Sequence, residues 1–206
     1  MARIRGITDI LTRYQSMSNS TTYTQLRLQD DGEEASIRFL YDDTAEIEGA
    51  VVHAEKIDDK FRRIMCLESP DCPLCRAFGK PSYKVFFQVY DTASGELKIW
   101  ERPPAMLKEL QTFFTKFTPI YKTTYAVVRH GKRNDKGTRY QVYPVGTDAD
   151  LELSSLPEQI ELFGPNAYVW ELPFADIVSL MSGSGGGATN KVRGDRSRTS
   201  SDEDLF

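Results

Sequence analysis

The segment YKVFFQVYDTASGELKIWER, residues 83–102, decides the fold class of this chain. Two runs rich in β-branched and aromatic residues, 83–90 and 97–102, flank the polar turn Asp91–Gly95, and this pattern predicts a β-hairpin. Short runs of the same kind recur on both sides of the hairpin, at 26–28, 36–41, 50–53, 61–65, 124–129 and 138–143. We therefore expect a mainly β protein.

One strong helical pattern lies among these strands. After Pro103 and Pro104, apolar residues recur at spacings of three and four, which predicts an amphipathic helix that faces a core: Met106, Leu107, Leu110, Phe113, Phe114 and Phe117. Further helices are expected near 156–163 and from Pro173 to Met181. Many short strands around one central helix are typical of a small Greek-key barrel, so we expect an OB-fold-like barrel with α additions.

Composition divides the chain into four parts. Residues 23–181 are expected to form the globular core, preceded by a basic N-terminal arm at 1–22. Residues 182–201 are rich in Gly and Ser and almost devoid of apolar side chains, which predicts a flexible linker. Neither a stretch of about 18 apolar residues nor a signal-peptide pattern is found, so membrane insertion and secretion are not expected.

The net charge is concentrated at the end of the sequence. A formal charge of -4 argues against a partner as acidic as nucleic acid. However, the acidic tip, residues 202–206, holds three of the 30 acidic residues, which leaves 27 acids against 26 bases elsewhere. The tip consists of Asp202, Glu203, Asp204, Leu205 and Phe206. Three acids and an apolar anchor on a flexible linker suit a basic pocket on a partner protein, and the same acids could compete with DNA for a basic groove.

Three cysteines within ten positions predict a metal site. The number of cysteines is odd, since there are only Cys66, Cys72 and Cys75, and no export signal is recognised in the sequence. Both points make a disulfide framework improbable. With His53 they form the donor set that a structural Zn²⁺ prefers, one ion per chain, in a subdomain near 53–80. His130, Asp71 or a water are alternatives for the fourth ligand. The alternative to a metal is that the cysteines are simply small buried residues.

Basic and aromatic residues gather on two further segments. Strand alternation places Lys98, Trp100 and Arg102 on one face, which predicts an indole platform for stacking bases, flanked by cations for phosphates. The hairpin 129–139 carries five bases against Asp135 alone. The candidate DNA-binding residues are Lys98, Trp100, Arg102, Arg129, Lys132, Arg133, Lys136, Arg139 and Tyr140, with Arg62, Arg63, Lys84 and Tyr90 nearer the metal site. The alternative is that the aromatic residues belong to the core and the basic loops are merely solvated.

The metal motif, the basic β-rich core and the acidic tip together resemble the zinc-containing helix-destabilising proteins of the T-even phages. His53 and Cys66 match the family's twelve-residue spacing, and Cys72 and Cys75 match its Cys-x-x-Cys pair, although the spacer between Cys66 and Cys72 is shorter. The resemblance implies a non-enzymatic protein that coats and protects single-stranded DNA during phage replication, recombination and repair, in the cytoplasm of the infected bacterium. The acidic tip is similar to the Phe-terminated tips of bacterial single-strand binding proteins, which recruit replication proteins.

Two other functions remain open from the sequence: a zinc-stabilised nuclease or primase accessory, and a zinc-containing protein–protein adaptor. The enzyme is disfavoured because the chain has two His and shows neither a phosphate-binding Gly loop nor a nucleophile motif. Self-association on DNA and the choice between DNA and RNA are left open.

Overall fold

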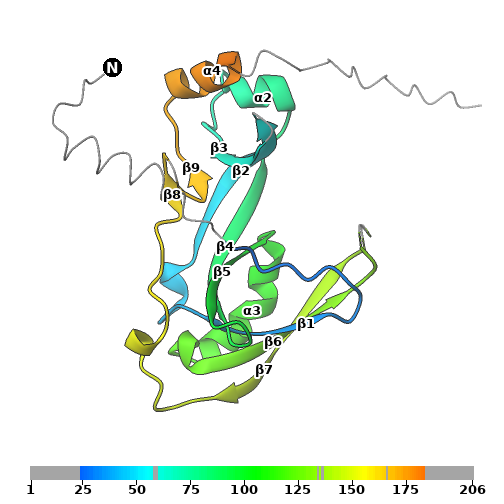
Figure 1. Cartoon of the computed structure of the whole chain (residues 1–206), viewed down its shortest axis with the longest axis vertical. Coiled ribbons are helices and arrows are strands. Elements are labelled where there is room, and N and C mark those ends of the chain that lie inside the picture. Colours follow the sequence, from blue (N-terminus) through cyan, green and yellow to red (C-terminus); the bar gives the residue numbers. More distant parts are fainter. Residues whose placement is uncertain (1–23, 58–59, 134, 136, 166, 184–206) are drawn as a thin grey trace, which may run out of the picture.

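The computed structural model describes residues 24–57, 60–133, 135, 137–165 and 167–183, and it is mainly β (Figure 1). The strands are β1 (Glu34–Phe39), β2 (Glu48–Ile57), β3 (Lys60–Met65), β4 (Ser82–Asp91), β5 (Glu96–Arg102), β6 (Thr123–His130), β7 (Arg139–Thr147), β8 (Phe163–Gly164) and β9 (Val169–Trp170). The helices are α2 (Pro73–Phe78), α3 (Ala105–Lys116) and α4 (Phe174–Gly183), with 3-10 turns η1 (Thr44–Glu46), η2 (Ile120–Lys122) and η3 (Leu153–Ser155). Among the described residues, no helix has both the length and the apolar content needed to cross a bilayer.

The β4–β5 hairpin lies at the centre of the sheet, as the sequence predicts. The strand order is β7-β6-β1-β4-β2-β3-β9-β8, and β5 pairs with the other edge of β4. β1 pairs with the C-terminal half of β4 and β2 with its N-terminal half, both antiparallel. The free edge of β5 is partly covered by residues 24–26, because the Leu26 amide donates to the Ile99 carbonyl at 3.0 Å.

The main core lies on one face of this hairpin and is capped by α3, whose predicted apolar stripe is confirmed. Met106, Leu110 and Phe114 are buried against the strands. Phe39 lies at the centre, with its ring centroid 4.9 Å from that of Phe114 and 5.2 Å from that of Tyr125. Figure 1 shows α3 beside the lower strands and, at the opposite end, α2 and α4 near the paired ends of β2 and β3.

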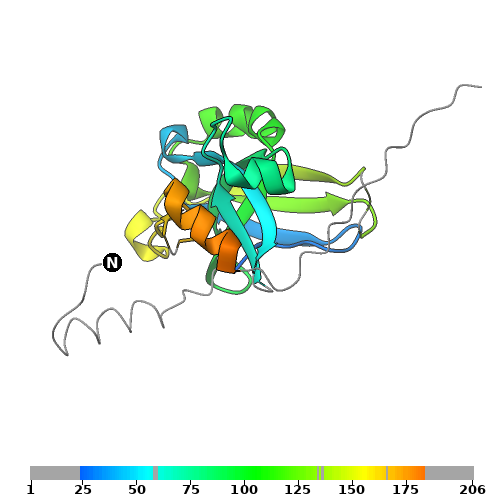
Figure 2. The ribbon, with the colours of Figure 1, turned by 90° about the horizontal axis from the view of Figure 1, so that it is seen from above.

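The other face of the hairpin is buried as well, under residues 160–169. A second apolar cluster there contains Phe86, Ile99, Leu162 and Val169. A third, smaller cluster joins α2 and α4 to the ends of β2 and β3. Figure 2 shows α4 beside α2 at this end of the molecule.

The prediction of a helix near 156–163 is wrong. The segment contains no helical residue: it follows η3 and leads into strand β8. The Gln88 side chain holds it to the sheet: its amide donates to the Ile160 carbonyl at 3.0 Å, and its oxygen accepts from the Ile160 amide at 2.7 Å. This pair replaces the bonds that a neighbouring strand would supply. The expected strand at 26–28 is likewise reduced to an isolated bridge at Gln25, whereas the helix from Pro173 is confirmed as α4.

Three expected regions fall largely or wholly outside the described residues. They are the basic arm at 1–22, the linker at 182–201 beyond its first two residues, and the acidic tip at 202–206. The first two residues of the expected linker belong to α4.

Candidate metal centre and nucleic-acid groove

Three segments bring the four expected metal ligands together. His53 lies on β2, Cys66 follows the end of β3, Cys72 precedes α2, and Cys75 lies within α2. The antiparallel pairing of β2 and β3 places His53 opposite Ile64, two residues before Cys66. Pro73 is suited to the first position of α2 because the amide it lacks would have no partner there, so the helix begins directly after Cys72.

The distances between the donor atoms fit a tetrahedral ion. The Cys66 sulfur lies 3.9 Å from that of Cys72 and 3.5 Å from that of Cys75. His53 Nε2 lies 3.4 Å from the Cys75 sulfur and 3.9 Å from the Cys72 sulfur. Zn–S bonds of about 2.3 Å and Zn–N bonds of about 2.0 Å give tetrahedral edges of roughly 3.5–3.8 Å. The sulfurs are too far apart for a disulfide, so the cluster is a candidate metal centre.

The surroundings of the cluster favour a closed site. His53 is 3 % exposed, and burial lowers the pKa of its imidazole, which favours the neutral form that binds metals. Burial and the neighbouring thiols of Cys66 and Cys72 raise the pKa of Cys75 to about 12, so its proton is firmly held unless a cation replaces it. Leu74 and Ile177 pack against the cluster.

The geometry favours His53 over the other candidates for the fourth ligand. Within the described part of the chain, the donor atoms of His53 and the three cysteines all lie within 4.8 Å of one another. Asp71 instead forms an exposed ion pair with Arg76. His130 lies on β6, where its Nε2 is 3.2 Å from the Gln141 side-chain oxygen.

A basic groove of about 480 Å³ lies beside β5, between residues 25–29 and the β6–β7 hairpin. Of the residues that the structure describes, six cationic ones and one acid line it. The basic groove is defined by Arg27, Arg63, Lys84, Arg102, Arg129, Arg133 and Glu101, with Gln25, Leu26, Leu28, Gln29, Ile99 and Tyr140. Six of the thirteen expected DNA-binding residues therefore lie together: Arg63, Lys84, Arg102, Arg129, Arg133 and Tyr140.

The expected stacking platform at Trp100 is wrong. Trp100 is 0 % exposed and packs in the main core, with its ring centroid 5.8 Å from that of Phe87. Both faces of β5 are covered, one by the main core and the other by residues 160–169, so alternation does not separate a buried from an exposed face here. Lys98, the expected neighbour of the platform, is paired with Asp91 and is 17 % exposed.

Arg129 has a structural role in the wall of the groove. It is 8 % exposed, and its guanidinium donates to the Lys132 carbonyl at 3.0 Å and to the Tyr140 hydroxyl and Thr138 Oγ1 at 2.9 Å each. These bonds tie together both strands of the β6–β7 hairpin and its loop. Lys132 therefore contributes its carbonyl here, while its side chain is exposed outside the groove.

The hydrogen-bond donors of Arg102 are less fully used than those of Arg129. Its guanidinium carbon lies 3.7 Å from the ring centroid of Tyr140 and 4.8 Å from that of Trp100. Burial lowers the pKa of Arg102. Among the described residues, its buried Nε has no hydrogen-bond partner. A cation held between two rings with an unused donor is suited to bind an anion.

A second pocket, the α3 pocket, adjoins the basic groove. It has a volume of about 820 Å³ and shares Arg102, Arg129 and Tyr140 with the groove. Apolar side chains of Met106 and Val142 line it together with the expected residue Arg139. The groove therefore continues toward the start of α3.

The remaining expected residues lie elsewhere. The Arg62 guanidinium carbon lies 3.9 Å from the ring centroid of Trp170, on the side of the metal centre. Tyr90 is half-buried on β4, outside the lining of the groove. Lys136 lies outside the described residues.

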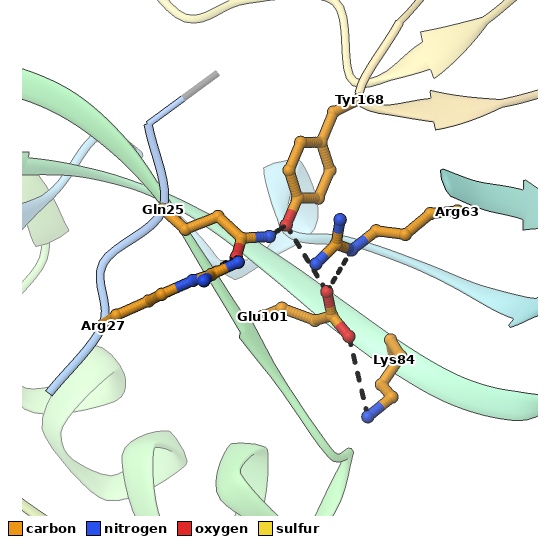
Figure 3. Close-up of polar contacts among 6 residues, drawn as sticks. All are labelled: Gln25, Arg27, Arg63, Lys84, Glu101 and Tyr168. Atoms are coloured by element: carbon orange, nitrogen blue, oxygen red, sulfur yellow. Dashed lines mark hydrogen bonds and ion pairs between the residues drawn. The ribbon is translucent and has the colours of Figure 1, made fainter. Parts of the chain in front are cut away.

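Sequence reasoning missed Arg27 and the polar network around Glu101 (Figure 3). Strand alternation in Leu26-Arg27-Leu28 could have found Arg27, because both leucines are buried in the main core. Nothing in the sequence indicates that Tyr168, far along the chain, reaches Glu101 with its hydroxyl at 3.4 Å.

Comparison with protein-family models and with curated proteins finds no match to this chain. The functional argument therefore depends on the geometry of the metal centre and the basic groove.

Proposed function

We propose that this protein binds single-stranded DNA without marked sequence preference, with the strand's phosphates in the basic groove. The observation that carries the proposal is the groove itself, where, among the described residues, six cationic side chains and a single acid converge from five separate segments of the chain. Cations that follow a sugar–phosphate backbone give affinity without reading sequence.

The α3 pocket favours a single strand over a duplex. Its partly apolar walls, at Met106 and Val142, adjoin the cationic groove at Arg102. Unpaired bases can pack against such apolar walls, whereas the bases of a duplex are stacked inside the double helix and cannot reach them.

Phe61 supplies a candidate stacking surface in place of Trp100. Its side chain is 60 % exposed on β3, and the guanidinium carbon of Arg63, a groove residue, lies 5.3 Å from its ring centroid. An exposed ring at the edge of a cationic groove is suited to stack an unpaired base.

The sheet supports the proposal of an OB-like barrel. β1 and β2 share one edge of β4, β5 covers the other edge, and residues 24–26 extend β5 toward β6. The Trp100 and Tyr140 ring centroids, 5.9 Å apart, join β5 to β7 across the remaining opening. OB-folds bind single strands across such a surface.

The metal is proposed to be Zn²⁺ with a structural role. His53 and the three cysteines complete a tetrahedron, and a catalytic zinc keeps one position open for water or substrate. This supports an ion that takes no part in catalysis, which is consistent with the proposed non-enzymatic function. Functions in phage replication, recombination and repair, inside an infected bacterium, rest on the resemblance of the metal motif.

The acidic tip, residues 202–206, is proposed to recruit replication proteins and to compete with DNA for the basic groove. If the linker is flexible, as its sequence predicts, three acids at its end would be at high effective concentration near the groove. Deleting the tip should tighten oligonucleotide binding and abolish capture of the partner. Unchanged affinity and intact capture would reject this role.

Fluorescence anisotropy with labelled single-stranded and duplex oligonucleotides tests the proposed function. The full chain should prefer the single strand, and Arg102→Met should weaken its binding by about tenfold, the effect of losing one charged contact. Arg38→Met is the matched control, because Arg38 is half-buried outside the groove and bonds the Lys122 carbonyl at 2.8 Å. Equal affinity for the duplex, cleavage of the oligonucleotide, or an absence of binding would each contradict the proposal, and the last would favour a protein adaptor.

A further inference from the structure

Glu101 is the only acidic residue among the described residues that line the basic groove. Its carboxylate lies between two of the groove's cations (Figure 3). One oxygen accepts from Arg63 Nε, and the other lies 3.6 Å from Lys84 Nζ. The side chains of Glu101 and Arg63 are 17 % and 12 % exposed, so this pair is largely shielded from water.

A second set of contacts fixes the carboxylate in place. The Tyr168 hydroxyl lies 3.4 Å from the oxygen that Arg63 binds, and the Arg63 guanidinium carbon lies 4.5 Å from the Tyr168 ring centroid. Gln25 donates to the Tyr168 hydroxyl and accepts from Arg27 Nε at 2.7 Å. Glu101 is thus held by groups from β3, β4 and the segment before β9.

A carboxylate in this position has the chemistry of the proposed ligand. Carboxylates and phosphodiesters both present two oxygens that accept charge-assisted hydrogen bonds from Arg and Lys. Within the described residues, Glu101 is the carboxylate in every ion pair that the groove cations form. Arg63 and Lys84 are therefore engaged before any strand arrives, whereas Arg102 has an unused donor.

We infer that Glu101 is an internal counter-anion that competes with DNA phosphate for Arg63 and Lys84 and so sets the affinity of the groove. This inference rests on the proposed function. A phosphate that approaches either cation competes with the Glu101 carboxylate, so the wild-type protein binds the strand mainly through the other cations.

The test is oligo-dT binding by the full-length protein with Glu101→Gln, which keeps the shape and removes the charge. We expect binding about three- to tenfold tighter, the worth of one freed ion pair. The plot of log K against log salt should steepen by about 0.7 for each cation released to a phosphate. The matched control is Glu96→Gln, which removes one acid from the same strand at an exposed position outside the groove and should change affinity less than twofold.

Lys84→Met provides a second arm, because Lys84 is more exposed than Arg63 and its loss should be tolerated. We expect it to weaken binding less than twofold in the wild type and at least threefold in the Glu101→Gln background. If the Glu101→Gln variant does not fold, Lys84→Met in the wild-type background becomes the test. A loss of oligo-dT affinity of more than threefold in that variant overturns the inference.

The outcomes separate this inference from the proposed function. Folded Glu101→Gln that binds equally or more weakly, while the wild type binds well, overturns the role of Glu101 and leaves the groove as the binding site. A wild-type protein that binds no oligonucleotide overturns both.

Discussion

If the candidate metal centre holds the proposed Zn²⁺, removal of the ion should unfold the subdomain formed by α2 and the ends of β2 and β3, while the main core stays folded. The apolar cluster there is small: besides two cysteines, its buried residues are Ile57, Ile64, Leu74 and Ile177. Burying four such side chains contributes about 6–12 kcal/mol.

Ordering the chain around the metal costs more than this. Residues 66–79 include fourteen positions, and fixing each backbone costs about 1–2 kcal/mol, or about 14–28 kcal/mol in all. Binding of Zn²⁺ to a structural site contributes about 10–16 kcal/mol, which closes the difference. We therefore expect the cluster to stay ordered only while an ion is bound.

Hydrogen exchange with mass spectrometry measures this directly. After chelation, the amides of Arg76 and Gly79, which donate within and just after α2, should exchange at least a hundredfold faster. The Leu40 and Tyr121 amides, which donate to Gln88 and Tyr41 at the main core, should change little. Cys72→Ser should reproduce the effect of chelation.

Asp71→Asn is the matched control, since Asp71 is adjacent to Cys72 but bonds Arg76. It should retain one zinc per chain and normal protection. Protection of α2 that survives complete removal of the metal would refute the reasoning, and so would a metal content well below one ion per chain in protein purified without a His tag.

Three further predictions concern the core and the groove. Trp100→Ala should lower the free energy of unfolding by about 3–5 kcal/mol in urea titrations, because it leaves a cavity beside Phe39 and Phe87; a loss below 1 kcal/mol would contradict the burial of this ring. Arg129→Met should lower the free energy of unfolding by about 1.5–3 kcal/mol, since its part-buried partners lose a charged donor. A variant that loses only DNA binding would reject its structural role. Burial raises the pKa of Tyr125 to about 12, so the folded state holds a proton that the unfolded state loses near pH 10, and stability should fall between pH 10 and 12 by at most about 1.4 kcal/mol per unit. A Tyr125→Phe variant with the same alkaline profile would contradict this assignment.

The elements with strong local patterns could be predicted from the sequence. The β4–β5 hairpin, α3 and α4 follow from alternation, helical spacing and turn residues. The candidate metal centre was also predictable, because only two residues separate Cys72 from Cys75 and Cys66 lies close before them. His53 is also the expected fourth ligand, and the pairing of β2 with β3 favours it over the alternatives His130 and Asp71.

The failures share one cause, which is packing by distant segments. Residues 160–169 bury Ile99 on one face of β5, and the main core buries Trp100 on the other, so the expected platform is lost. The same segment is extended rather than helical because Gln88, far away in sequence, bonds its backbone. Local periodicity carries no information about such contacts.

The salt dependence of oligo-dT binding tests the central claim most directly. If Arg27, Arg102 and Arg133, with a contribution from Arg129, hold the phosphates, a plot of log K against log salt should have a slope of about -2 to -3, from about -0.7 for each neutralised phosphate. Arg102→Met should make the slope shallower by about 0.7, and Arg38→Met should leave it unchanged. A slope near zero, or one that Arg102→Met does not alter, would contradict the assignment of this groove as the strand's binding site.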